Sequence, residues 1–345
     1  MAEKKHSIKR GVSLYSYQEE FFLQKMSLEN CIAAVAKTGA TGIEIVGEQS
    51  IWGFPKLTDA FVDKWFGWMD KYGVTPVCHD FMLDYTMIKG KYYSDEEALQ
   101  SIIRDLKFAK RLGFKIMRAI VNITPELMEK AAPYAEEYDI KIGIEVHSPW
   151  HINSAWMARH WEVMEKTGSK YLGFVPDMGA FTKRLARVQT DRMIREGADP
   201  AIVEFVCEQH EKGVMAEYII AQVSQMSKRP IDIAVAELAR HNTYYNPNAL
   251  LQHIPRIFHI HAKFYEMLDN GTEFSIPYEK IIPILIDGGY DGYLSSEYEG
   301  NRHIQDVYEV DSVEQVRRQQ EMFKRLLGET PEVPATKEAV VIEKF

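Results

Sequence analysis

Short runs rich in β-branched and other apolar residues recur along the chain, and longer segments with a helical spacing of apolar residues separate them. This alternation is typical of repeated βα units around a parallel sheet. Eight runs are predicted as strands: GVSLYSY (11–17), GIEIVG (42–47), TPVCHDF (75–81), KIMRAIVN (115–122), IKIGIEVH (140–147), LGFVPDMG (172–179), IFHIHAKF (257–264) and GYLSSEYEG (292–300).

The segments between these runs carry helix signals. MSLENCIAAVAKTG ends in a glycine, and SDEEALQSIIRDLKFAKRLG opens with serine and acidic residues and closes on Arg-Leu-Gly. A helix that stops at glycine and is soon followed by a strand recurs in TGATGIEI, KYGVTPV, RLGFKIM, TGSKYLGFV and DGGYDGYLS. Eight such units predict an α/β fold, the (β/α)8 TIM barrel, whose chemistry sits at the C-terminal ends of the strands.

One interval, residues 180–256 between the sixth and seventh strands, is far longer than the other crossovers. Its stretches DPAIVEFVCEQHEKG and IDIAVAELARHN predict an ordered helical insertion on the active-site side of the barrel. Two roles stay open for it, a roof over the pocket or a layer that packs or contacts another subunit. We predict one barrel domain over residues 1–328, including this insertion, and a tail over residues 329–345.

Composition narrows the class of protein. The 345 residues carry a formal net charge of −9, which disfavours a nucleic-acid partner and fits a protein that handles small neutral molecules. Three scattered cysteines are too few for a disulfide framework or a thiolate metal site, so we expect buried, reduced thiols. No apolar run approaches the length of a membrane span, and we expect a cytoplasmic location.

Side chains that bind metals follow four successive strands near their ends: Glu145, Asp177, His261 and Glu297. Any one of them alone is more often a loop cap or an ion-pair partner. Together they would bring three carboxylates into one enclosed mouth, where the charges repel unless a cation is bound. Three carboxylate oxygens and one imidazole nitrogen suit Mn²⁺, or Mg²⁺ or Co²⁺, with two coordination positions left for substrate.

These residues carry a resemblance to a known family. The pattern resembles the xylose isomerase-like barrels of sugar isomerases and epimerases. It consists of a Glu on strand five, the Asp of VPD on strand six, the His-x-His of strand seven and a Glu on strand eight. The resemblance covers about residues 10–328, and it implies that the same four residues bind one Mn²⁺ or a similar ion.

A narrower resemblance rests on GVSLYSYQEE, IEVHSPW, the long helical insertion and SSEYEG. Together they are similar to the catalytic alpha subunit of bacterial C-glycoside deglycosidases. This resemblance implies cleavage of the carbon–carbon glycosidic bond in 3-oxo aryl C-glycosides. It also implies a second, small, β-rich subunit and hence a hetero-oligomer.

Two further residues are predicted to act in catalysis. His147 lies two positions beyond Glu145, so it faces the same cavity without joining the predicted ligands and could be a general base or a hydrogen-bond partner of a ligand. Lys263 could hold a developing oxyanion, and His259 is predicted to be a buried structural partner.

Residues on several other strands and loops are candidates for binding substrate. They are Gln18, His79, Asp80, Arg118, Trp150 and Glu299, with Trp52 and Phe81 as further aromatic walls. Two alternatives stay open: Glu44 could brace the barrel, and Glu299 could replace Glu297 as the ligand if the strand position is off by two residues.

A hard cation beside a base suits removal of a proton from a carbon next to a carbonyl. Loss of a β-substituent from the resulting intermediate would make the protein a lyase. Return of the proton would make it a ketose epimerase or isomerase, in which Glu145 and Glu297 could serve as paired bases. A keto-inositol-type dehydratase shares the first step. A metal-free carbohydrate-binding barrel would need none of the four ligands.

Overall fold

The computed structural model describes residues 6–86 and 88–329, and it confirms the predicted TIM barrel. Eight parallel strands form one sheet in the order β6-β5-β4-β3-β2-β1-β8-β7. The bridges Phe174↔Ile257 and Asp177↔His261 join its two edges, which nearly closes the barrel. The strands are β1 Lys9–Ser13, β2 Gly42–Val46, β3 Thr75–Phe81, β4 Ile116–Ala119, β5 Lys141–Val146, β6 Leu172–Pro176, β7 Ile260–Phe264 and β8 Tyr293–Tyr298.

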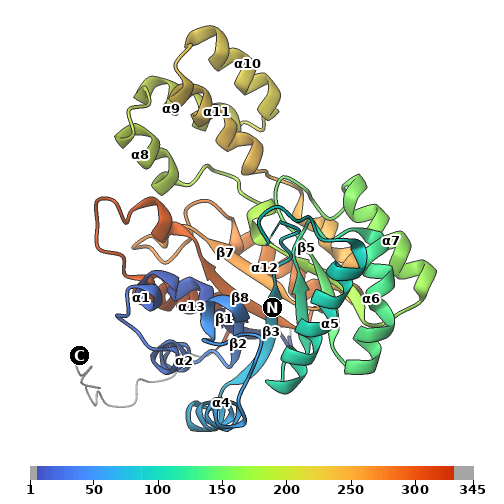
Figure 1. Cartoon of the computed structure of the whole chain (residues 1–345). Helices are drawn as coiled ribbons and strands as arrows, with labels where there is room; N and C mark the ends of the chain where they lie inside the picture. The colour runs from blue at the N-terminus through green and yellow to red at the C-terminus, as the bar shows by residue number, and fades with distance from the viewer. Residues whose placement is uncertain (1–5, 87, 330–345) are drawn as a thin grey trace, which may run out of the picture.

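Helices cover the outside of this barrel (Figure 1). The longer ones are α2 Leu28–Lys37, α4 Asp59–Tyr72, α5 Asp95–Arg111, α6 Pro125–Tyr138, α7 Ala155–Thr167, α12 Tyr278–Asp287 and α13 Ser312–Leu326. Short turns follow three strands on the active-site side: η1 Leu14–Tyr17 with α1 Gln18–Phe22, α3 Gly47–Ser50, and η4 Gly300–His303.

Local sequence explains where the helices begin and end. The hydroxyls of Ser27 and Ser94 each accept a hydrogen bond from the backbone N–H of the third residue of the helix that follows. The side chain of that third residue accepts one from the serine N–H, which completes a capping box. Gly73 and Gly168 follow α4 and α7 with φ of 63° and 60°, a left-handed conformation that glycine adopts at no steric cost. These stops turn the chain back toward the next strand after only a few residues.

The long interval between β6 and β7 is helical, as predicted. It contains η2 Met178–Ala180, α8 Arg187–Arg195, α9 Pro200–Glu211, α10 Ala216–Met226, α11 Pro230–His241 and η3 Pro247–Arg256. Helices α8–α11 form a lobe that stands beyond the barrel (Figure 1), with its own buried apolar cluster around Val206, Val223 and Val235. The lobe therefore has a small core separate from that of the barrel.

Other expectations concern thiols, membranes and the tail. Cys31, Cys78 and Cys207 are free, and the first two are buried. Among the residues that the structure describes, no helix is both long and apolar enough to cross a membrane. The predicted tail over residues 329–345, apart from its first residue, lies outside the described residues.

Candidate active site

His261 on β7 lies at the centre of a buried cluster of carboxylates. Its Nδ1 is 3.2 Å from Glu145 Oε1 and 3.6 Å from Glu297 Oε1. On the other side of the ring, Nε2 is 3.3 Å from Glu44 Oε1 and 3.5 Å from Asp80 Oδ1. Strands β2, β3, β5, β7 and β8 thus send polar side chains to one point inside the barrel.

Asp177, the residue after β6, completes the predicted ligand group. Donor atoms of Glu145, Asp177 and His261 all lie within 4.8 Å of one another. Oδ1 of Asp177 accepts a hydrogen bond from the Gly179 N–H at 2.6 Å, and its Oδ2 lies 2.7 Å from Lys263 Nζ. The structure therefore brings the other three predicted ligands, Glu145, Asp177 and Glu297, close to His261.

Unpaired polar atoms show that this cluster fits a cation. Both ring nitrogens of His261 and Oε2 of Glu297 are buried and make no hydrogen bond. Buried polar atoms of a folded protein almost always have a partner, and a coordinated ion would supply one. These buried acidic and histidine side chains can hold a divalent cation.

The two sides of the His261 ring suggest different roles. Nδ1 faces Glu145 and Glu297, which belong to the predicted ligand set. Nε2 faces Glu44 and Asp80, and a carboxylate on the second nitrogen is the usual partner that orients a metal-binding imidazole. Glu44 also accepts a hydrogen bond from His259, which fits the expected structural role of His259.

The surroundings shift the pKa values of the buried carboxyl groups in opposite directions. Burial alone would raise the pKa of Asp80 and of Glu145, but the Arg118 guanidinium and His261 outweigh it and hold both pKa values below the usual range. Burial, together with nearby Asp177 and Glu299, raises the pKa of Glu297 well above its usual range despite His261 and Lys263. Glu297 is thus the carboxyl group that most needs another positive charge nearby.

His147 and Lys263 lie beside the cluster and contact each other. Lys263 Nζ is 3.0 Å from His147 Nε2, and His147 Nε2 is 3.7 Å from Asp177 Oδ2. His147 Nδ1 is 2.6 Å from the Ser148 carbonyl oxygen, which only accepts, so Nδ1 carries the hydrogen. In the neutral ring the lone pair is then on Nε2, which accepts a hydrogen bond from Lys263.

Two of the predicted substrate-binding residues, Arg118 and Glu299, border this region. Arg118 Nε donates to Asp80 at 3.1 Å, and its Nη1 is 3.8 Å from Glu145. Glu299 Oε1 is 3.4 Å from Lys263 Nζ, whereas Glu297 is the residue beside His261. Trp150 follows β5 and is partly exposed.

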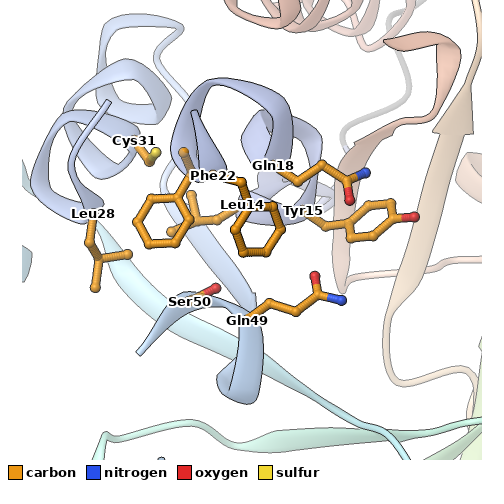
Figure 2. Close-up of a pocket in the computed structure, with 9 residues that line it drawn as sticks. Leu14, Tyr15, Gln18, Phe22, Leu28, Cys31, Gln49 and Ser50 are labelled. Carbon is orange, nitrogen blue, oxygen red and sulfur yellow. The ribbon is translucent and has the colours of Figure 1, made fainter. Parts of the chain in front are cut away.

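Gln18 lines a narrow pocket above the ends of β1 and β2 (Figure 2). The ends of Tyr15, Gln18 and Gln49 point to one side of it, and Leu28 and Cys31 lie on the other. Nε2 of Gln18 and Oε1 of Gln49 are buried without hydrogen-bond partners. The pocket thus offers unused amide groups on the active-site side of the barrel.

The structure does not bring His79 to the site. Its side chain points away from the barrel interior, is fully buried, and lies 2.8 Å from Asp105 Oδ1 on α5. Strand side chains alternate between the two faces, so Asp80 faces inward and His79 outward. Phe81 is also fully buried in the core, and Trp52 is 93% exposed, so neither forms a wall of this cluster.

Glu44 is the residue whose place the sequence left open. In GIEIV it is the one charged residue of a strand in which every residue is buried. A lone carboxylate in such a strand must find a partner, and that signal could have pointed to the barrel interior. The identity of the partner, His261 on a distant strand, required the closed barrel.

The fold and the cluster define a class of protein. The sequence profile of the xylose isomerase-like TIM barrel family matches residues 32–326, and the chain belongs to this family. Two curated relatives are similar along almost their whole length. The 3'-dehydrocarminate deglycosidase alpha subunit of Microbacterium sp is 31% identical, with 92% of this chain and 95% of the relative covered. The C-glycoside deglycosidase alpha subunit of Arthrobacter globiformis is 29% identical, with 97% and 96% covered.

Solved structures agree on the fold. The crystal structure of D-psicose 3-epimerase in the presence of D-fructose has a TM-score of 0.56 and 13% identity, with 93% of this chain and 100% of that chain covered. The IOLI protein with a binding zinc atom has the same TM-score and identity, with 93% and 98% covered. Both the broad and the narrow resemblance noted in the sequence are thus confirmed.

Proposed function

We propose that this chain cleaves the carbon–carbon bond between an aryl group and C1 of a 3-oxo sugar. The observation that carries the proposal is the placement of His147, whose Nε2 lies 3.0 Å from Lys263 Nζ and 3.7 Å from Asp177 Oδ2 although His147 is not one of the predicted ligands. The names of the two curated relatives support the same substrate class.

The first step removes the proton on C2, which the neighbouring C3 carbonyl acidifies. The His147 Nε2 lone pair takes this proton, and the electrons of the C2–H bond form an enolate with the C3 oxygen. In this proposal Lys263 Nζ, 3.0 Å from that nitrogen, moves its hydrogen bond from Nε2 to the C3 oxygen and stabilises the oxyanion. A divalent cation, when held by Glu145, Asp177, His261 and Glu297, would polarise the sugar carbonyl and its neighbouring hydroxyl.

The second step breaks the bond to the aryl group. The C3 carbonyl re-forms, a C1=C2 double bond is made, and the electron pair of the C1–aryl bond leaves with the aglycone. A phenolic ring stabilises that carbanion, which then takes a proton on carbon from the His147 imidazolium, so that the base is regenerated. An epimerase would instead return a proton to the opposite face of that carbon, and Glu145 and Glu297, which both face Nδ1 of His261, would be its candidate bases.

A second subunit is part of the proposal because the relatives are named alpha subunits. Large exposed aromatic side chains follow three strands on the active-site side: Trp52 after β2, Tyr92 after β3 and Tyr308 after β8. Exposed apolar groups gathered on one face mark interaction surfaces. We expect Trp52→Ser to weaken binding of the second subunit, and Phe66→Ser on α4 to leave it unchanged.

The decisive experiment incubates the Mn²⁺-loaded chain, with and without its second subunit, with a 3-oxo aryl C-glucoside and separately with free ketohexoses. Release of the aglycone supports the proposal. Epimerised ketose without aglycone release would replace it with the epimerase. No metal retained after dialysis and no turnover would leave a carbohydrate-binding barrel instead.

A further inference from the structure

The helical lobe joins the barrel through a two-stranded neck, formed by residues 177–183 and 241–245. Phe181 and Tyr244 form an antiparallel bridge across it. The Thr182 N–H donates to the Thr243 carbonyl at 2.8 Å, and the Tyr245 N–H donates to the Ala180 carbonyl at 3.1 Å. Both segments of the neck lie next to residues of the candidate site.

The outgoing segment of the neck is bonded to the loop after β5 through one hydroxyl. Ser148 Oγ donates to the His241 carbonyl at 2.7 Å, so its only hydrogen is used there. The Thr243 hydroxyl, 3.0 Å away, must therefore donate to Ser148, and the Thr243 N–H also donates to it at 3.3 Å. All three hydrogen-bonding positions of this buried hydroxyl are filled by the neck.

The same serine holds the imidazole of His147. The Ser148 carbonyl accepts the hydrogen of His147 Nδ1 at 2.6 Å, which leaves Nε2 directed at Lys263. Ser148 is thus fixed to the neck by its side chain and to His147 by its backbone. A shift of the neck would move the carbonyl that selects the ring tautomer.

The incoming segment reaches a predicted ligand in a similar way. The Thr182 hydroxyl donates to the Gly179 carbonyl at 2.8 Å, and the Gly179 N–H donates to Asp177 Oδ1 at 2.6 Å. A Cβ atom at Gly179 would lie 2.9 Å from that same oxygen, so the close approach requires glycine. One neck therefore orients both His147 and Asp177.

We propose that the neck of the helical insertion is a positioning element of the active site. In it, Ser148 and Thr243 hold the His147 ring so that Nδ1 donates to the chain and the Nε2 lone pair faces the cavity. The proposal rests on the proposed function in one respect, the role of His147 as the base. The geometric part, that the neck selects the tautomer, is independent of any activity.

The test of the geometric part is the ¹⁵N spectrum of the histidine side chains in the full chain with Mg²⁺, which is diamagnetic. The His147 signals are assigned by their loss in His147→Gln. We expect Nδ1 protonated in the wild type and a mixture of tautomers in Ser148→Ala and in Thr243→Val. Thr243→Ser keeps the hydroxyl and should restore the wild-type spectrum. Thr190→Val, which removes a buried hydroxyl from α8, is the control for a purely structural loss.

The second readout is turnover of the 3-oxo aryl C-glucoside at saturating substrate. Loss of a residue that orients an active-site group costs about 10-fold to 100-fold. We expect kcat to fall by that factor in Ser148→Ala and Thr243→Val, with KM and bound metal unchanged and with recovery in Thr243→Ser.

Each outcome separates the two proposals. Wild-type tautomer in both Ser148→Ala and Thr243→Val would overturn the positioning role, whether or not the wild type is active. If the tautomer changes in the two variants but the wild type releases no aglycone, the positioning role is kept and the proposed function is overturned. If Ser148→Ala fails to fold, Thr243→Val, which leaves the β5 loop sequence intact, decides alone.

Discussion

At the scale of single residues, the imidazoles of His147 and His261 occupy opposite situations. His261 is fully buried and has carboxylates within 3.6 Å on both sides of its ring. The His147 side chain is 39% exposed, and its Nε2 lies 3.0 Å from Lys263 Nζ. The first arrangement suits coordination, and the second suits proton transfer to and from a substrate.

Replacing His147 by alanine should separate these two roles. We expect His147→Ala to retain its metal through dialysis, since the four predicted ligands are intact, and to lose at least about 100-fold in kcat, the usual contribution of a general base. Elemental analysis and turnover measure the two effects. Tyr218→Ala, which removes an exposed ring from α10 of the lobe, should change neither. Loss of bound metal in His147→Ala would instead make His147 part of the coordination sphere.

Two glutamates on one strand provide a matched pair for the ligand set. Glu297 lies beside His261, whereas Glu299 contacts Lys263. We expect Glu297→Gln to weaken Mn²⁺ binding by at least about 10-fold, because a neutral amide replaces a charged ligand. Glu299→Gln should bind Mn²⁺ like the wild type, as measured by titration calorimetry. The reverse result would move the ligand two residues along β8.

At the scale of elements, the alternation of strand side chains decides which polar residues reach the site. On β3, Cys78 and Asp80 face the barrel interior, and His79 packs under α5 beside Phe108. His259, the residue before β7, and His261 and Lys263 on β7 share the inner face at successive layers, with Glu44 bonded to the first and close to the second. Along the barrel axis, this segment therefore supplies first the structural partner His259, then the predicted ligand His261 and then the charged Lys263.

Helix α7 carries a histidine that should make stability depend on pH. Burial lowers the pKa of His160 to about 4, and the ring packs edge-on against Trp156. As pH falls from about 6.5 to 4, the unfolded chain binds a proton that the folded chain excludes, so folding stability is lost. We expect this residue alone to remove about 2 kcal/mol between pH 7 and pH 5.

Urea unfolding of His160→Phe at the two pH values measures this contribution. The variant should lose less stability than the wild type between pH 7 and pH 5. The exposed-site variant His241→Phe should behave like the wild type. An identical loss in His160→Phe and the wild type would show that His160 does not resist protonation in the folded state.

At the scale of the whole molecule, the barrel gathers more carboxylates than the nearby Arg118 and Lys263 match, and a bound divalent cation would add positive charge among them. An ion that binds the folded chain and not the unfolded chain adds to the free energy of unfolding, by about 3 kcal/mol at a concentration 100-fold above its Kd. We therefore expect Mn²⁺ to raise the Tm of the wild type, and chelator to lower it. Differential scanning calorimetry of Glu297→Gln should show a smaller rise. An equal rise in both proteins would place the ion elsewhere.

The sequence alone determined the order of the elements, and it predicted a metal site that remains a prediction. Alternating short apolar runs and glycine-ended helices predicted eight βα units, because these signals depend only on neighbouring residues. It also predicted which strands carry metal-binding side chains, since the C-terminal ends of barrel strands share one face. The helical nature of residues 180–256 followed from the same local periodicity.

Tertiary structure decided the contacts that depend on closure of the barrel and those between residues far apart in the sequence. Glu44 meets His261 only because the barrel brings β2 and β7 to one centre. His79 is directed outward by its position in β3, which the sequence of that run does not reveal when both faces are buried. The bond from Ser148 to Thr243 joins residues 95 positions apart, and no local pattern encodes such a contact. Local periodicity fixes elements, whereas hydrogen-bond partners are fixed by packing.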